Sequence, residues 1–422
     1  MKKFSILALA ALLVVAFTVP AAALENEFGG YWRTRMHNQG HFNGEEDDST
    51  NQRVVDTRTR LFYTAKINDN LKLVNAFEMD AEWGGLGTYG DVGADEVAVE
   101  VKHSYADFNT GPVNWTVGAQ PYALFRGFAI ADDASGLIAR WKIMDNFVLA
   151  GSWLKNYEGG AGDGNNEDLD TYTVTGAFWF SENMSIKPSI SYARSSEVDA
   201  AFGTGLLAGR NGANGASGAA APFGEAEVWT YGFDFDAGFD MFSLWATAFG
   251  QSGDIETGAA VGDVDFSAWL AAVGASANLG PVELHGEFFY TPGDDDATDD
   301  EIENVFAPAA SYYWSEIMGF GVFDRDLPTG SPGDRIFNIM AGNIGVGFAP
   351  MDKLKVVADV WYAELDEDDA NGENELGTEI DLRVTYELVE GLNLDLVGAY
   401  LFAGDAVSDL GDNDEDPYEF GA

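Results

Sequence analysis

The sequence predicts an all-β fold: one transmembrane antiparallel β-barrel of about 18 strands, with about 16 as the alternative count. Three observations predict it. Polar and apolar residues alternate with a period of two from one end of the chain to the other. Short, turn-like connections alternate with long polar ones. Beyond the N-terminal segment, no run of about 18 apolar residues offers a membrane-spanning helix.

The first segment of the chain is expected to be removed on export. Two lysines precede an almost wholly apolar stretch over residues 4–19, and small residues at 21–23 suit cleavage. This order is typical of a secretory signal peptide, and the apolar stretch, which breaks at Pro20, is short for an anchoring helix. We therefore predict a signal peptide over residues 1–23 and a barrel over residues 24–422.

The stretch "DTRTRLFYTAKI" at residues 56–67 illustrates the alternation. Leu61 and Tyr63 occupy one parity, whereas Arg58 and Arg60 occupy the other. A soluble sheet would bury its apolar face against a core, yet this pattern recurs along the whole chain. In a barrel every backbone group is paired, the apolar parity faces lipid, and the polar parity faces a water-filled lumen.

Two kinds of connection separate these strands and set their number. The short ones are rich in Asn, Asp, Gly or Pro, which suit tight turns. They lie near residues 68–70, 109–112, 144–146, 181–183, 238–240, 278–281, 350–353 and 389–391. The long polar ones lie near residues 38–52, 84–96, 121–135, 158–168, 195–226, 251–263, 291–334, 364–377 and 403–416. Their strict alternation is typical of outer-membrane barrels, which have short periplasmic turns and longer extracellular loops.

The composition excludes several classes of function. With 70 acidic and 22 basic side chains the net charge is −48, which repels nucleic acid as a partner. The chain has no cysteine, which excludes disulfides, thiolate metal sites and covalent haem attachment. We find no nucleophile elbow, phosphate loop or haem motif, and expect neither an enzyme nor a cofactor. Ca²⁺ in the acidic loops is the one alternative, but no loop matches an EF-hand, and solvated loops explain them better.

Charged residues of the polar parity are the candidate functional residues, because charged rings and pore diameter select solutes in channels. Four arginines in the first two strands repeat at a spacing of two and predict a basic ladder that faces acidic walls across a constriction. The alternative is that charges simply pair inside the barrel. The predicted pore-lining residues are Arg33, Arg35, Arg58, Arg60, Lys66, Glu78, Asp80, Glu82, Glu100, Lys102, Arg140, Lys142, Asp234, Asp236, Glu379, Asp381 and Arg383.

One long connection, residues 291–334, differs from the others. It contains Tyr312, Tyr313 and Trp314, followed by the stretch 316–319. We expect this segment either to fold into the pore and narrow it or to contain a short additional strand.

Four stretches carry a resemblance to a known family. They are "DTRTRLFYTAKINDNLKLVNAFEMDAEWG", "HSYADFNTGPVNWTVGAQP", "YYWSEIMGFGVFD" and "ELGTEIDLRVTYELVEGLNLDLVGAYLFAGDA". The chain is similar to Gram-negative outer-membrane porins, in particular to the roughly 400-residue porins of sulfur- and metal-reducing deltaproteobacteria. The resemblance implies a cell outer-membrane location and contact with lipid and lipopolysaccharide. The oligomeric state stays open, with a homotrimer as one possibility because many porins are trimers. One departure concerns the last strand, which is short and has Phe420 third from the end. We expect either that the sequence is truncated or that residues 418–422 begin a strand that pairs incompletely at the barrel seam.

The expected function is a water-filled channel for passive diffusion of ions and small hydrophilic solutes. Two alternatives remain open: a substrate-selective or anionic-polysaccharide export barrel, and a barrel scaffold of an outer-membrane electron-transfer complex. Saturable block of the current by an anionic sugar would favour the first, and co-purification with a haem protein would favour the second.

Overall fold

The computed structural model describes residues 25–46, 49–85, 90, 99–157, 168–195, 223–257, 263–296, 299–308, 311–408 and 414–422. The predicted signal peptide, residues 1–23, lies outside the described residues. Within the described ranges, no helix has the length and apolar character needed to cross a membrane.

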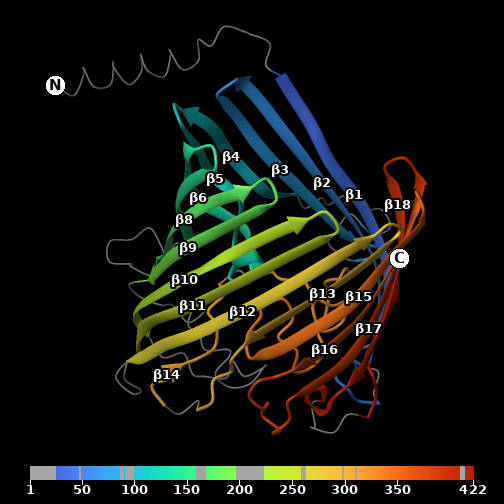
Figure 1. Ribbon diagram of the computed structural model, residues 1–422. Helices are drawn as coiled ribbons and strands as arrows, with labels where there is room; N and C mark the ends of the chain where they lie inside the picture. Colours follow the sequence, from blue (N-terminus) through green and yellow to red (C-terminus); the bar gives the residue numbers. More distant parts are fainter. Residues whose placement is uncertain are drawn as a thin grey trace, which may run out of the picture.

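Nineteen strands join into a single sheet, and all except β14 form a closed antiparallel barrel of 18 strands (Figure 1). The predicted fold class and strand number are therefore confirmed. Closure lets the sheet satisfy its own backbone hydrogen bonds, which lipid could not do. The barrel strands are β1 (Glu25–Gly40), β2 (Gln52–Asn68), β3 (Leu71–Glu82), β4 (Glu100–Thr110), β5 (Val113–Leu124), β6 (Ile130–Met144), β7 (Phe147–Tyr157), β8 (Leu169–Ser181), β9 (Met184–Ser195), β10 (Phe223–Phe239), β11 (Phe242–Thr257), β12 (Val264–Leu279), β13 (Val282–Thr291), β15 (Ile339–Met351), β16 (Leu354–Glu364), β17 (Glu375–Val389), β18 (Leu392–Ala403) and β19 (Tyr418–Gly421).

The connections follow the predicted alternation, with two corrections, the first of which is that β11 continues to Thr257 into the loop expected over 251–263. All eight short connections are two-residue turns between paired strands. The loop expected over 121–135 covers only residues 125–129, because β5 and β6 stay paired as far as Leu124 and Ile130. Pro121 and Asp133 resemble loop residues in the sequence, but they lie opposite each other in this ladder. A single 3-10 turn, η1 (Phe125–Gly127), occupies the connection.

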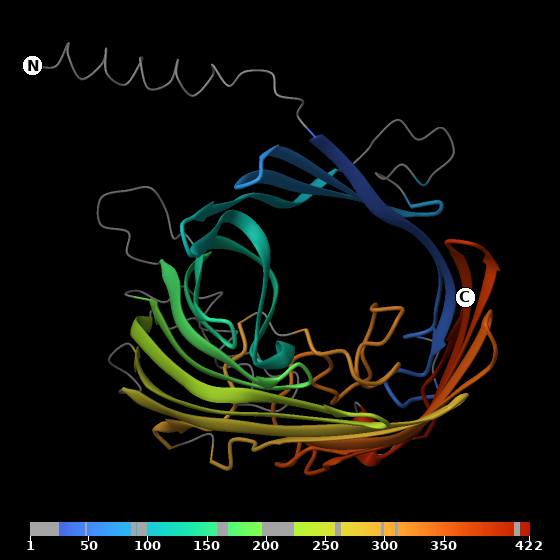
Figure 2. The same ribbon diagram turned by 45° about the horizontal axis from the view of Figure 1, so that its top comes forward.

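The connection between β13 and β15 contains both features that the sequence left open. β14 (Glu301–Ile302) is a two-residue strand that lies parallel to β12, outside the barrel ladder. The segment that follows it turns into the interior of the barrel (Figure 2).

The last strand closes the barrel over a short length. β19 pairs with β18 at Val397–Tyr400 and with β1 at His37–Gly40. Two backbone hydrogen bonds of 2.9 Å also join Met36 and Ala422. Incomplete pairing at the seam is therefore observed, since in the described part of the chain residues 25–35 of β1 pair only with β2.

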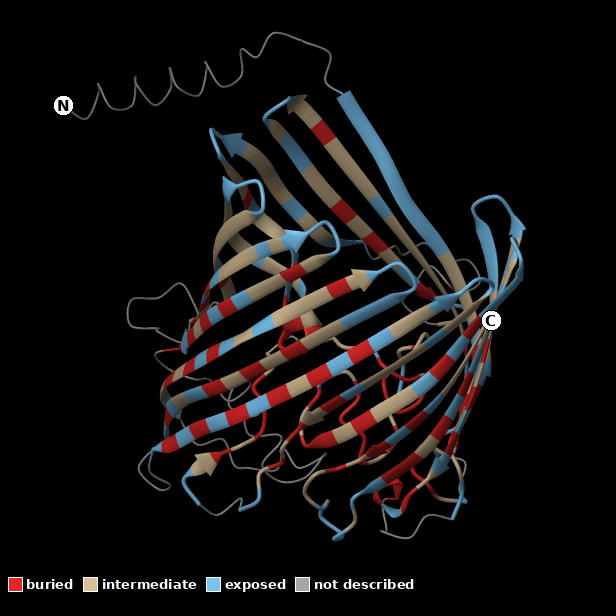
Figure 3. Cartoon of the chain, viewed as in Figure 1, coloured by how far each residue is buried: buried red, intermediate tan, exposed pale blue. Residues whose placement is uncertain are grey.

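Buried and exposed residues alternate along the strands, as Figure 3 shows. In β17, Ile380 and Leu382 are 45% and 47% exposed, whereas Glu379 and Asp381 are 0% and 7% exposed. The apolar side chains thus cover the outside of the barrel and the charged ones turn inward. This is the reverse of a soluble protein and agrees with the alternation that the sequence predicts for a barrel in lipid.

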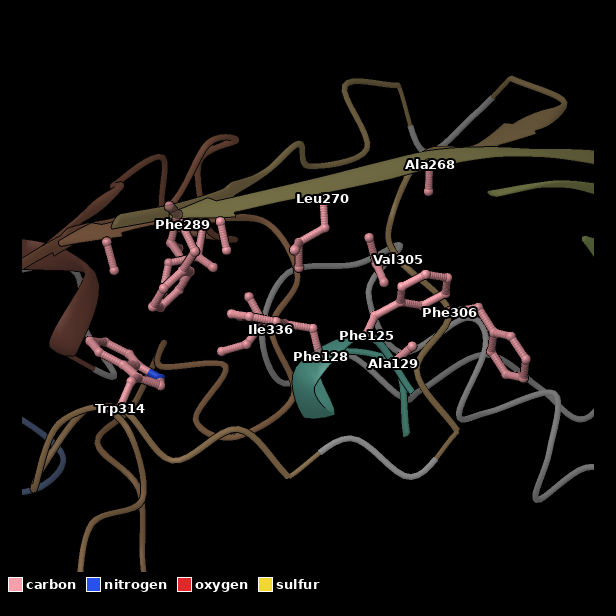
Figure 4. Packing of buried hydrophobic residues seen from close by; sticks show 14 of the residues in the cluster. Phe125, Phe128, Ala129, Ala268, Leu270, Phe289, Val305, Phe306, Trp314 and Ile336 are labelled. Carbon is pink, nitrogen blue, oxygen red and sulfur yellow. The ribbon is translucent and has the colours of Figure 1, made fainter. Parts of the chain in front are cut away.

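An apolar core lies inside the barrel, against the inner face of β12 and β13 (Figure 4). Leu270 of β12 and Phe289 of β13 are fully buried there, together with Phe125 and Phe128 from the β5–β6 connection. This corrects the expectation that the inward parity is polar throughout. Both parities of β12 are apolar, and inward-folded loops rather than water cover the inner one.

Candidate functional site

Residues 311–338, which we call the inner loop, lie inside the ring of strands (Figure 2, orange). Two glycines allow its tight path. A Cβ at Gly319 would lie 2.2 Å from the Ser315 backbone nitrogen, and one at Gly321 would lie 2.4 Å from Glu316 Cα. Of the two structures that the sequence suggested for this segment, the inward fold is thus the one that shapes the lumen.

Glu379 on β17 holds one end of the inner loop. Its carboxylate accepts hydrogen bonds from the N–H groups of Ile317 (2.6 Å) and Met318 (2.9 Å) and from the Ser315 hydroxyl (3.0 Å). A buried carboxylate is tolerated when its oxygens are hydrogen-bonded, and bonds to a charged acceptor are the stronger kind. Glu379, which the sequence placed among the pore-lining residues, therefore anchors the loop.

Arg35 on β1 holds the middle of the inner loop. Its guanidinium donates to the carbonyl oxygens of Val322 (2.8 Å) and Phe323 (2.9 Å) and pairs with Asp324. The same group pairs with Asp56 on β2 at 2.9 Å. The planar fork of arginine can serve several acceptors at once, which a lysine could not do in this geometry.

A third set of contacts joins the inner loop to β3. Arg325 pairs with Glu82 at 2.9 Å, and its Nε donates to Gln52 at 3.2 Å. The loop is therefore fixed to β17 by a carboxylate of the barrel and to β1–β3 by arginine pairs.

Aromatic packing joins the inner loop to the β5–β6 connection. Tyr312 stacks on Phe128 with 3.8 Å between ring centroids, and its hydroxyl donates to Glu287 on β13 at 3.1 Å. Trp314 packs edge-on against Trp361 of β16 at 5.2 Å. The two inward segments consequently pack together and narrow the interior.

Arg126 in η1 is a candidate residue that the sequence analysis missed. It donates to Asp236 on β10 at 2.6 Å and to Thr247 on β11 at 3.3 Å, and its guanidinium lies 4.6 Å from the centroid of Trp245. Its φ of 56° is in the left-handed region, which non-glycine residues seldom adopt. The only signal in the sequence is a lone arginine in the apolar stretch "ALFRGFAIA".

We expect Arg126→Ala to loosen η1 while the barrel stays folded. The change removes a charge-assisted hydrogen bond and a cation–π contact, together worth about 2–4 kcal/mol. Hydrogen exchange of residues 123–130 should therefore become faster. Lys142→Ala is the matched control, because it also removes one positive charge but breaks only an exposed ion pair with Asp145. Equal exchange in both variants would contradict the assigned role.

Four arginines lie on the neighbouring strands β1 and β2, and we call them the arginine wall: Arg33, Arg35, Arg58 and Arg60. Arg33 lies opposite Arg58 in the β1–β2 register. Arg58 pairs with Asp80 at 2.6 Å, and Arg60 pairs with Glu78. These acidic partners lie on the neighbouring strand β3, so the charges pair side by side rather than across the lumen.

Apart from Glu78 and Asp80, the other predicted residues make no ion pair with the arginine wall in the described part of the chain. Glu100 lies opposite Glu78 in the β3–β4 register. The side-chain contacts of the others are Lys66 with Glu25, Lys102 with Asp133, Arg140 with Thr116, Lys142 with Asp145, Asp234 with Thr247 and Arg383 with Asp395. Lys66 and Lys142 lie near the two-residue turns, far along the strands from the inner loop.

The structure describes only part of the acidic loops for which Ca²⁺ was the alternative. Among the described residues, no cluster of three or more His, Asp or Glu side chains is arranged to hold a metal ion. Residues 47–48, 158–167 and 409–413 of these loops lie outside the described ranges. For these residues the expectation of solvated loops, with Ca²⁺ as the alternative, stays a prediction.

Glu316, beside the Glu379 anchor, makes docking of the inner loop depend on pH. Burial raises the pKa of the Glu316 carboxyl, and the carboxylates of Glu379 and Asp359 act in the same direction. The Val322 N–H and the Arg383 guanidinium act against this shift. Because the pKa is higher in the docked loop than in a solvated one, docking is strongest below the ordinary value of 4.5 and weakens as the pH rises through the raised pKa.

We therefore expect protection of the inner loop from proteolysis to decrease as the pH rises from 4 towards 8. Each unit of difference in pKa corresponds to roughly tenfold in the docking equilibrium. Glu316→Gln should remove this component of the pH dependence, while a parallel titration of wild type retains it. An identical pH profile in the two proteins would exclude Glu316 as the titrating group.

The fold has counterparts among solved structures. OccK8 (OprE) of Pseudomonas aeruginosa superimposes with a TM-score of 0.55 over 94% of this chain and 97% of its own, at 10% identity. A BenF-like porin from Pseudomonas fluorescens Pf-5 gives 0.55 over 94% and 97%, at 11% identity. OccAB3 of Acinetobacter baumannii gives 0.54 over 94% and 98%, at 9% identity.

These likenesses establish the barrel fold, because fold alone is shared at so low an identity. No protein-family model matches the sequence, and no curated protein is significantly similar to it. The resemblance to deltaproteobacterial porins therefore stays a prediction.

Proposed function

We propose that the chain is an outer-membrane porin, a water-filled channel through which ions and small hydrophilic solutes diffuse passively. The observation that carries this proposal is a closed barrel of 18 strands with an apolar outer surface and many inward charged residues. Barrels of this size leave an aqueous interior unless loops fill it. Such a channel needs no reacting group, so the proposal assigns no catalytic residue.

The outer surface supports a location in the cell outer membrane, in contact with lipid and lipopolysaccharide. Ile344 and Phe28 are 80% and 82% exposed, and Leu382, Leu396 and Phe402 are exposed as well. An apolar surface of this extent would cause aggregation in water, whereas hydrocarbon covers it. The homotrimer rests on the resemblance alone, and light scattering of the detergent-solubilised protein tests it.

The inward segments support a restricted channel rather than an open one. The inner loop and η1 pack together inside the barrel, and the predicted pore-lining residues, above all the arginine wall, are proposed to line the remaining passage. The same filling disfavours a barrel that sheathes another protein, since part of the chain already occupies its interior.

Swelling of proteoliposomes in sugars of increasing mass tests the proposal. We expect swelling in arabinose and much slower swelling in raffinose, because the inner loop limits the passage. Replacing residues 313–324 with a short Gly-Ser linker should reduce the difference between the two sugars. Swelling no faster than that of protein-free liposomes, with the protein shown to be inserted, would contradict the porin proposal.

A further inference from the structure

A cavity of about 600 Å³ lies between the inner loop and the inner face of β13, β15, β16 and β17. Small-molecule sites typically have volumes of about 300–1,000 Å³, so this space can hold a small solute. Four carboxylates contribute to its lining: Glu287, Glu316, Asp359 and Asp381.

These four carboxylates differ from those beside the arginine wall. On β3, Asp80 pairs with Arg58 at 2.6 Å. Among the described residues, none of the four cavity carboxylates has a lysine or arginine nitrogen within 4.0 Å. Asp359 contacts the His285 ring and accepts a hydrogen bond from the Asn343 amide, each at 2.8 Å. The inward charges on β1–β3 thus neutralise one another in pairs, whereas the cavity keeps an excess of negative charge.

The lysine and the arginine of the cavity lining do not neutralise these four carboxylates. Lys355 is exposed on β16, and Arg383 donates to Asp395 at 3.3 Å. Of the four carboxylates, Asp381 most clearly lacks a hydrogen-bond donor. It is only 7% exposed, its Oδ1 has no hydrogen-bond partner in the described structure, and its Oδ2 lies 3.4 Å from the Glu316 backbone nitrogen. A buried carboxylate oxygen without a donor is costly unless something else supplies one.

The aromatic part of the lining indicates which kind of donor fits. Trp361 and Tyr313 also line this cavity. The face of such a ring attracts an ammonium or guanidinium group and packs well against its alkyl part. A hydrated inorganic ion would use the carboxylates but gain little from the rings.

We infer that the cavity binds a small organic cation with an ammonium or guanidinium group, its charge at Asp381 and Glu316 and its apolar part against Trp361. The inference deepens the proposed function, on which it rests for access from solvent, by naming a solute class.

Block of the channel current by butylguanidinium tests the inference at pH 8 in planar bilayers. We expect half-block at a concentration about tenfold higher in Asp381→Asn and in Glu316→Gln than in wild type, corresponding to about 1.4 kcal/mol. Glu283→Gln is the matched control, since it removes a carboxylate from β13 outside the cavity lining and should leave the half-block concentration unchanged. Benzoate, an anion of similar size, should not block at the same concentrations.

A second measurement does not require a current. Addition of butylguanidinium to the detergent-solubilised protein should quench tryptophan fluorescence in wild type, and the quenching should disappear in Trp361→Phe and weaken in Asp381→Asn. Conductance with no block and no quenching would overturn the cavity inference while leaving the porin proposal intact. Quenching without any conductance would support the cavity and contradict the porin.

Discussion

Glu379→Ala is expected to release the inner loop from β17 and to raise the single-channel conductance. The wild-type carboxylate is fully buried and accepts three hydrogen bonds, from two backbone N–H groups and the Ser315 hydroxyl. Alanine leaves these buried donors unsatisfied, which costs the docked loop about 3 kcal/mol or more. That exceeds the effect of most single substitutions, so a large part of the population should have the loop undocked.

Single-channel recording together with limited proteolysis measures this release. Glu387→Ala serves as the control, because Glu387 has the same inward parity in β17 but lies next to a two-residue turn. We expect higher conductance and faster cleavage within 311–338 only in Glu379→Ala. If both variants conduct and resist protease as wild type does, the anchoring role is wrong.

Arg58→Glu/Arg60→Glu is expected to shift the ion preference of the channel towards cations. In wild type these arginines balance Asp80 and Glu78 on the neighbouring strand. The double change places two further carboxylates beside them, and the wall becomes strongly negative at short range, where salt screens little. The cation-to-anion permeability ratio should rise on the order of tenfold, which corresponds to about 1.4 kcal/mol.

Reversal potentials in a salt gradient measure this shift. Arg58→Gln/Arg60→Gln removes the charges without reversing them and should give an intermediate value. An unchanged reversal potential in the charge-reversed variant would show that the arginine wall only holds the barrel and inner loop together.

The strands and turns were predictable because their signals are local. A period of two shows in any window of a few residues, and Asn, Asp and Gly mark each two-residue turn, as at residues 68–70. The same logic failed at β5–β6, where Pro121 and Asp133 suggested a loop although both lie in strands.

The contacts of the inner loop were not predictable in this way. The Arg35 guanidinium and the Val322 carbonyl oxygen are 287 residues apart in the sequence, and no periodic pattern connects them. The sequence marked the segment only by its aromatic residues. Equally, both parities of β12 are apolar, so the alternation could not show that loops cover Leu270 from inside.

The arginine wall was predicted as a group, but its partners were not. A spacing of two places arginines on one face of a strand, yet it says nothing of the register with the next strand. That register puts Arg58 beside Asp80, and it makes Arg33 the neighbour of Arg58. The sequence accordingly identified the charged residues and left open whether they face or flank their acidic partners.

The central claim, that the barrel encloses a water-filled passage narrowed by the inner loop, is tested most directly by single-channel conductance in planar bilayers. We predict discrete current steps for the wild-type protein that persist over a range of voltages. The current steps should be larger when residues 313–324 are replaced with a short linker. Protein that inserts into the bilayer but gives no steps in either form would contradict it.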